Sequence, residues 1–160
     1  MISYCFAQLV DLQQIHTGIG DLFAFFLHEE KRDLVCTLRV SEKKDNFEVF
    51  AQVNELGDDL LVILYGGPRP HIGAIGIVQP RFSLKDPETI GGTSSVFTFL
   101  GHKEDVVAKE MSEELASKLN GKVVVVARMH WEGLQGEGID EAIGLCQRLT
   151  EKILIRIRGG

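Results

Sequence analysis

Cysteine and proline are scarce in this sequence, which has three cysteines and four prolines among its 160 residues. The cysteines, Cys5, Cys36 and Cys146, are far apart and form no CxxC pair, which argues against a disulfide framework or a structural zinc site. A long apolar run and a basic, signal-like N-terminus are also missing. We therefore expect no membrane-spanning segment, no secretory signal and a cytoplasmic location.

Basic residues are fewer than acidic ones, 17 against 23, and the formal net charge is -6. A broadly basic surface for nucleic acid is therefore not expected. Apolar residues make up 44% of the chain, and its length suits one domain with a buried core. Glycine is abundant, at 17 residues, and marks either tight turns or places where backbone approaches a ligand closely.

The apolar pattern predicts a series of strands followed by a helix, a strand and a second helix. The apolar run at 60–65 indicates burial on both faces of its strand, whereas residues 22–27 fit a strand or a helix equally well. The predicted fold is a single α/β (α+β) layered domain over 1–160, with one mixed, mostly antiparallel sheet and two C-terminal helices. The expected strands are 34–40, 47–53, 60–65, 72–78, 96–100 and 123–126, and the expected helices are about 101–119 and 139–152.

The order of these elements predicts that several polar residues meet at one edge of the sheet. If strand 60–65 pairs antiparallel with 72–78 and strand 96–100 runs back, a right-handed crossover makes 123–127 parallel to 96–100. The loop at 66–71, the helix start and the end of the last strand then lie together. The residues collected there are Arg69, His71, His102, Lys103, Arg128 and His130.

Each of these side chains has an ordinary explanation alone: His71 can close a turn, and Lys103 can be a solvated charge. Their convergence favours a site, because open α/β sheets build sites from polar groups at one edge. Three histidines could bind a divalent metal, but their wide spacing lacks the short helical motif of a strong metal site. We favour a phosphate held by cations and helix-start amides, with a flat ring on the small residues 73–76.

A second candidate is the segment Gly91–Ser95, where the hydroxyls of Ser94 and Ser95 and a flexible backbone could form an anion nest. It lacks the GKS or GKT ending of a Walker loop, and a surface loop at the opposite end of the sheet is the simpler interpretation. No GxSxG or HExxH motif is present, so nothing indicates an activated nucleophile. This favours a protein that is not an enzyme and leaves an enzyme as the alternative.

Three segments, in order, also resemble one family. Gly66–Ile75 is similar to the GGxxPHIGA stretch of the small D-type (LpdD-like) accessory proteins of gallate and hydroxyarylic acid decarboxylases. Thr93–Asp105 resembles that family's segment around GHK, and Val123–His130 resembles its VVV strand ending in histidine. The likeness covers roughly residues 47–132, and residues 1–45 form an N-terminal extension outside it.

The resemblance implies a chaperone for prenylated flavin mononucleotide (FMN) or its reduced precursor, with delivery or maturation of the cofactor for a UbiD-type decarboxylase. It also implies a small cytoplasmic homodimer, with a flavin prenyltransferase as a further partner. A small metalloenzyme using the three histidines, or an assembly chaperone binding only protein surfaces, are the alternatives. The expected cofactor-binding residues are Arg69, His71, Gly73, Ser94, Ser95, His102, Lys103 and His130.

Overall fold

The structure, a computed structural model, describes residues 36–83, 86 and 88–159. The described residues belong to one compact unit that starts at Cys36, and the apolar segment 22–27 lies outside them. No helix in this described part is long and apolar enough to cross a membrane. The elements are β1 (Cys36–Lys44), β2 (Phe47–Leu56), β3 (Asp59–Gly66), β4 (Ala74–Phe82), β5 (Ile90–Thr98), α1 (Asp105–Leu119), β6 (Val123–Met129) and α2 (Glu137–Arg158).

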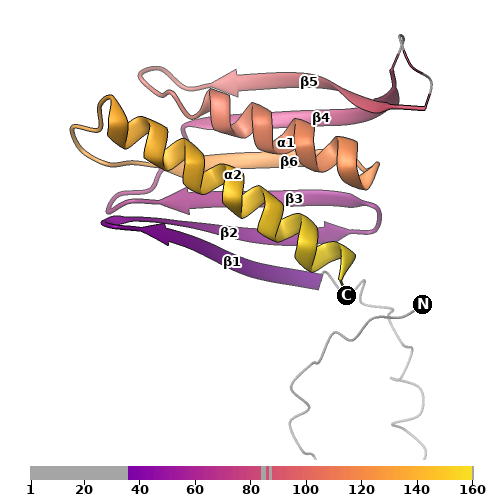
Figure 1. Ribbon diagram of the computed structural model, residues 1–160. Coiled ribbons are helices and arrows are strands. Elements are labelled where there is room, and N and C mark those ends of the chain that lie inside the picture. Colours follow the sequence, from indigo (N-terminus) through magenta and orange to yellow (C-terminus); the bar gives the residue numbers. More distant parts are fainter. Residues whose placement is uncertain (1–35, 84–85, 87, 160) are drawn as a thin grey trace, which may run out of the picture. The chain divides into compact units, whose positions relative to one another are not determined.

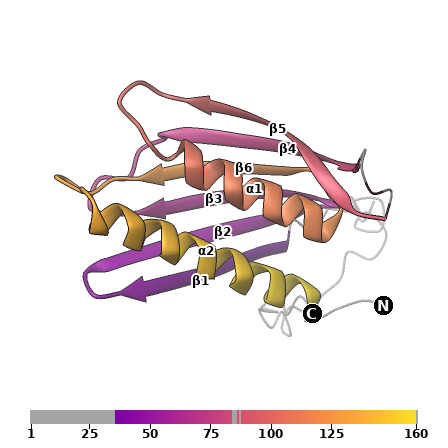
Figure 2. The ribbon, with the colours of Figure 1, turned by 45° about the horizontal axis from the view of Figure 1, so that its top comes forward.

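The strands form one six-stranded sheet in the order β1-β2-β3-β6-β4-β5. β3 and β6 run parallel, and the other neighbouring pairs are antiparallel. Both helices lie on the same face of this sheet, as Figure 1 shows, and the view in Figure 2 agrees. The predicted fold, one mixed and mostly antiparallel sheet with two C-terminal helices, is confirmed.

The core lies between the sheet and the two helices. Successive strand side chains point to opposite faces, and in β3 Val62 and Leu64 are fully buried, while Leu61 and Ile63 are half-buried. The prediction that 60–65 is buried on both faces is therefore wrong for this chain, because helices cover one face only. The helical residues that close the core include Val107, Met111, Leu115, Leu145, Leu149 and Ile153.

The predicted pairing of β3 with β4 is also wrong, because β6 lies between them. The connecting loop crosses the end of β6: the Gly67 φ of 80° turns the chain there, and the His130 N–H donates to the Gly66 carbonyl at 3.1 Å. A Cβ atom on Gly67 would lie 1.9 Å from the His130 carbonyl oxygen. Only glycine lets the loop pass this close. β6 runs in the same direction as β5, as predicted, but β4 separates the two.

Several boundaries differ from the predicted ones. The expected surface loop Gly91–Ser95 is part of β5, because its backbone pairs with β4, as in the partnership of Ser94 with Val78. β1 continues to Lys44, which shortens the first turn to two residues. The helix ending at Leu119 begins only at Asp105, and the last helix continues to Arg158.

Candidate functional site

The structure brings the three histidines together at one end of the sheet. His71 lies in the loop between β3 and β4, His102 lies in the loop before α1, and His130 follows β6. The ring centroid of His71 is 4.6 Å from that of His102 and 4.9 Å from that of His130. Three segments far apart in sequence therefore form one imidazole cluster, which we call the histidine cluster.

The hydrogen bonds of His71 and His102 constrain where their protons lie. The Nδ1 atom of His71 is 3.0 Å from the carbonyl oxygen of Arg69, and a carbonyl only accepts, so this Nδ1–H donates. The Nδ1 of His102 lies 3.3 Å from the carboxylate of Glu104. The two Nε2 atoms face each other at 3.2 Å. With the proton of His71 on Nδ1, a His102 tautomer that carries its proton on Nε2 donates to the Nε2 of His71.

Glu104 is the carboxylate beside this pair of imidazoles. Its side chain is only 12% exposed, and it also accepts a hydrogen bond from the backbone N–H of Lys103 at 3.0 Å. The carboxylate fills the space above Gly73, where a Cβ atom would lie 2.5 Å from Oε2. Glu104 and Asp105 together place two carboxylates at the start of α1, where a phosphate would meet like charge.

The small residues 73–76 do not offer an open surface to a flat ring. A Cβ atom on Gly76 would lie 2.4 Å from the backbone oxygen of Ala108, in α1. Ala74 is fully buried. These small residues let α1 pack closely on β4, so the helix occupies the place that the sequence interpretation gave to a ring.

The other cations predicted for this edge are less tightly held. Arg69 pairs with Glu132 at 3.4 Å, and both side chains are at least 70% exposed, so this ion pair contributes little to stability. Lys103 is exposed beside the histidine cluster. Arg128 lies next to Tyr65 in the sheet register, on the face that carries no helix, and so does not join the histidines.

Ser94 and Ser95 lie away from the histidine cluster, in β5. The hydroxyl of Ser94 donates to the carboxylate of Glu113 in α1 at 2.6 Å. Ser95, the next residue, faces the opposite side of the sheet and is exposed. The two hydroxyls therefore do not converge on one point.

A cavity of about 270 Å³ opens beside the histidine cluster, between the starts of α1 and α2. The sequence interpretation missed most of its apolar wall, although Trp131 and Leu134 stand out as large apolar residues in a glycine-rich loop. The Trp131 ring is held edge-on against Phe47, with centroids 5.5 Å apart. The residues that line this cavity are Gly101, His102, Lys103, Glu104, Val107, Met129, His130, Trp131, Leu134, Ile139, Ala142 and Ile143.

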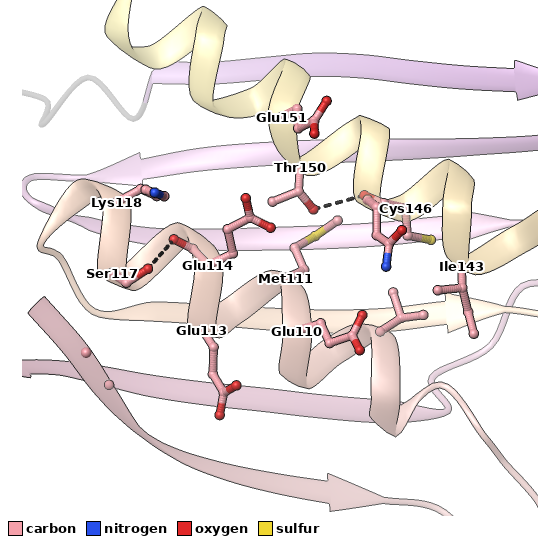
Figure 3. A pocket seen from close by; sticks show the side chains of 14 residues that line it. Glu110, Met111, Glu113, Glu114, Ser117, Lys118, Ile143, Cys146, Thr150 and Glu151 are labelled. Atoms are coloured by element: carbon pink, nitrogen blue, oxygen red, sulfur yellow. Dashed lines mark hydrogen bonds between the residues drawn. The ribbon is translucent and has the colours of Figure 1, made fainter. Parts of the chain in front are cut away.

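A larger cavity, of about 770 Å³, lies between α1 and α2 and is strongly acidic. Figure 3 shows the carboxylates of Glu110, Glu113, Glu114 and Glu151 around it, with Lys118 at one end. An anionic ligand would be repelled there. The smaller cavity has Lys103 and the imidazoles of His102 and His130 in its lining, against the single carboxylate of Glu104. It is therefore the better candidate for a phosphate-bearing ligand, despite its size.

Cys146 lies in the wall of the acidic cavity and is 2% exposed. Burial raises the pKa of its thiol to about 12, because the low-dielectric interior disfavours the thiolate. Its Sγ contacts the Met129 sulfur at 3.7 Å. This cysteine is therefore a packing residue and not a nucleophile.

Comparison with protein families identifies the chain. The model of the prenylated flavin chaperone LpdD-like domain matches residues 43–158, which is most of the chain and all of the candidate site. The chain belongs to this family. The match includes the loops that carry His71, His102 and His130, and it extends beyond the 47–132 of the sequence resemblance.

Among curated proteins, the chain is similar to Protein LpdD of Lactiplantibacillus plantarum, with 25% identity over 108 residues. The alignment covers 68% of this chain and 76% of that protein. Among solved structures, it is similar to a chain in the crystal structure of a chaperone complex for yeast 20S proteasome assembly, with 13% identity and a TM-score of 0.42. That match covers 72% of this chain and 98% of the other. It is too distant to support an inference about function.

Proposed function

We propose that this chain binds prenylated FMN, or its reduced precursor, without catalysing a reaction, and delivers or matures it for a UbiD-type decarboxylase. The observation that carries the proposal is the coincidence, within the family-matched residues 43–158, of an apolar cavity with a histidine cluster at its mouth. The chemistry of decarboxylation belongs to the cofactor in the partner enzyme. This chain supplies binding, orientation and shielding from water.

The cavity fits part of such a ligand. Small-molecule sites typically enclose about 300–1,000 Å³, and the 270 Å³ beside the histidines is just below that range. We assign the apolar ring system, with its prenyl-derived portion, to the wall formed by Trp131, Leu134 and Ile143. The ribityl phosphate then remains outside the cavity, near Lys103 and Arg69.

His71 and His102 serve two purposes in this proposal. Their ring nitrogens can hydrogen-bond the phosphate or a polar edge of the flavin. Their Nε2 atoms, 3.2 Å apart, hold the two rings together at the mouth of the cavity. The carboxylate of Glu104 lies beside this pair, 3.3 Å from the Nδ1 of His102.

The partners follow from this role. We propose a UbiD-type decarboxylase as the recipient, a flavin prenyltransferase as the source of the cofactor, a homodimer as the working form and the cytoplasm as the location. A chaperone must release what it binds, so we expect the apolar wall to hold the flavin more weakly than the recipient enzyme does.

Anaerobic co-expression with a flavin prenyltransferase tests the proposal. The purified chain is expected to carry a flavin absorbance spectrum and to pass the cofactor to an apo-decarboxylase, measured as restored decarboxylation. A chain that neither retains nor exchanges any flavin contradicts the proposal. A stable complex with the decarboxylase that persists without flavin would support the protein-only assembly chaperone instead.

Variants of the cavity mouth locate the site. We expect His102→Leu to weaken flavin retention by at least about 10-fold, because it removes an imidazole that lines the cavity and can hydrogen-bond the ligand. Lys103→Met is expected to weaken retention by a smaller factor, and Lys109→Met, an equally exposed lysine of α1 outside the cavity, serves as its matched control. If all three variants retain as much flavin as the wild-type chain, the flavin binds at another site.

Metal analysis tests the alternative that the chain is a small metalloenzyme. In the described part of the chain, no group of three or more histidine, cysteine, aspartate or glutamate residues is arranged to hold a metal ion. Stoichiometric metal in untagged protein, lost in His102→Leu, would favour the metalloenzyme and contradict the proposed function.

A further inference from the structure

One face of the sheet carries apolar side chains with no helix over them. Both helices lie on the opposite face (Figures 1 and 2). The pairing registers align the uncovered side chains in rows across the strands. One row contains Gln52, Ile63, Val126, Ile75 and Phe97, and the next contains Asn54, Leu61, Val124, Ile77 and Ser95.

These two rows define a surface that we call the open-face patch, apolar over β3, β6 and β4 and polar at β2. Ile77 is 51% exposed and Phe97 is 60% exposed, while Ile63 and Val126 are half-buried by their neighbours. Contiguous apolar patches of this kind on soluble proteins mark interaction surfaces. The parallel pair β3 and β6 is also of the type usually covered on both faces.

Arg128 is a polar residue at the end of the patch. Its Nε atom is buried and has no hydrogen-bond partner among the described residues. Tyr65, its neighbour in the register, is stacked on Phe50 with ring centroids 5.3 Å apart. A buried N–H without an acceptor costs free energy, and a second layer on this face would bring acceptors to it.

We infer that the open-face patch is the interface with a second copy of this chain, so that two sheets stack into a sandwich. From β2 to β5 neither row contains a charged residue, and the first row meets a charge only at Arg39 in β1, beside Gln52, so the centres of two copies can meet without contact between like charges. Most other surfaces of a protein with a net charge of -6 repel their own copies. An uncharged apolar patch is complementary to itself, as a two-fold interface requires.

The size and shape of the face also suit a second copy. With strands about 4.8 Å apart and residues about 3.3 Å apart, the whole six-stranded face, with the patch at its centre and charged residues such as Arg39 toward its edges, offers roughly 700 Å² to a partner. Standard interfaces bury about 800 Å² on each partner. Two copies have sheets of the same twist, and sheets of equal twist pack face to face with their strands nearly aligned.

This inference takes the homodimer from the proposed function and assigns its surface, without depending on flavin binding. Sedimentation or light scattering of the full chain is expected to give a mass of twice 17.8 kDa. Val126→Glu, at the centre of the patch, is expected to weaken dimerisation by at least about 100-fold, because each copy would bury an unpaired charge. Gln52→Glu, at the polar end of the same row, is the matched control and is expected to remain dimeric.

Circular dichroism verifies that Val126→Glu is folded, and Ile77→Lys replaces it if it is not, because Ile77 is already half-exposed. A monomeric wild-type chain overturns the inference, as does a dimer that survives both substitutions or dissociates equally in Gln52→Glu. Coverage of the patch by another part of the same chain would appear as the monomeric result. Flavin retention measured on the same samples separates the two proposals, since a dimer without flavin contradicts only the proposed function.

Discussion

In the middle of β3 and β6 both faces of the sheet carry apolar side chains, but the surroundings of the two faces differ. On the covered face, Leu64 and Val125 are completely buried beneath α1 and α2, and glycine and alanine let the helices approach the strands. On the open face, Ile63 and Val126 alternate with them along the same strands and stay half-buried. The difference shows that hydrophobicity marks a side chain for burial, but the position of the helices decides which face the monomer itself buries.

The largest expected difference between the faces is in the free energy of unfolding. Leu64→Ala is expected to destabilise the chain by about 3 kcal/mol, because it leaves a cavity in the core. Ile63→Ala, its neighbour on the open face, should cost about 1 kcal/mol when the chain is dilute enough to be monomeric. Urea denaturation of both variants measures this difference, and equal losses would mean that the open face is already covered within one chain.

The close packing of α1 on the covered face predicts a second, smaller difference in the free energy of unfolding. Gly76→Ala should cost about 2 kcal/mol, because the new Cβ would lie 2.4 Å from the Ala108 backbone oxygen and the helix would have to shift. Gly91→Ala is the matched control, since its Cβ would meet only the Arg81 oxygen at 4.0 Å. Thermal unfolding is the measurement, and a neutral Gly76→Ala would show that α1 is less tightly packed on β4 than described.

The smallest expected effect concerns the chemical reactivity of Cys146, which α2 places toward the core. Because burial raises the pKa of this thiol to about 12, it should resist alkylation at mildly alkaline pH in the folded chain and react once the chain unfolds. Peptide mapping after iodoacetamide treatment distinguishes it from the other cysteines. Rapid labelling of folded protein would indicate that the helices leave the covered face.

Several features were predictable from local sequence alone. The strand runs, such as Val123–Val126, and the four-residue apolar period of α1 identify elements whose types the structure confirms. The convergence of His71, His102 and His130 was also predictable, although the predicted strand order was wrong. The direction of each strand follows from the number and kind of connections before it, so the same loops reach the same end of the sheet in either order.

The apolar cavity was less accessible to sequence reasoning. Trp131 and Leu134 are conspicuous in a glycine-rich loop, but their partners Ile139 and Ile143 come from a helix whose position depends on long-range packing. The sequence correctly indicated that something packs closely on Gly73 and Gly76, but the predicted flat ring was the wrong explanation. Their small size accommodates Glu104 and α1. The sequence could not predict this, because a missing side chain gives no information about what fills the space.

The sequence by itself determined the element types, the strand directions and therefore the end of the sheet where the histidines meet, because these depend on local periodicity and on the order of connections. Only the tertiary structure decided that β6 lies between β3 and β4, that both helices cover one face, and that the Nε2 atoms of His71 and His102 face each other. The physical reason is that backbone hydrogen bonds do not depend on which side chains the two strands carry. The choice of neighbours depends on the packing of the whole chain.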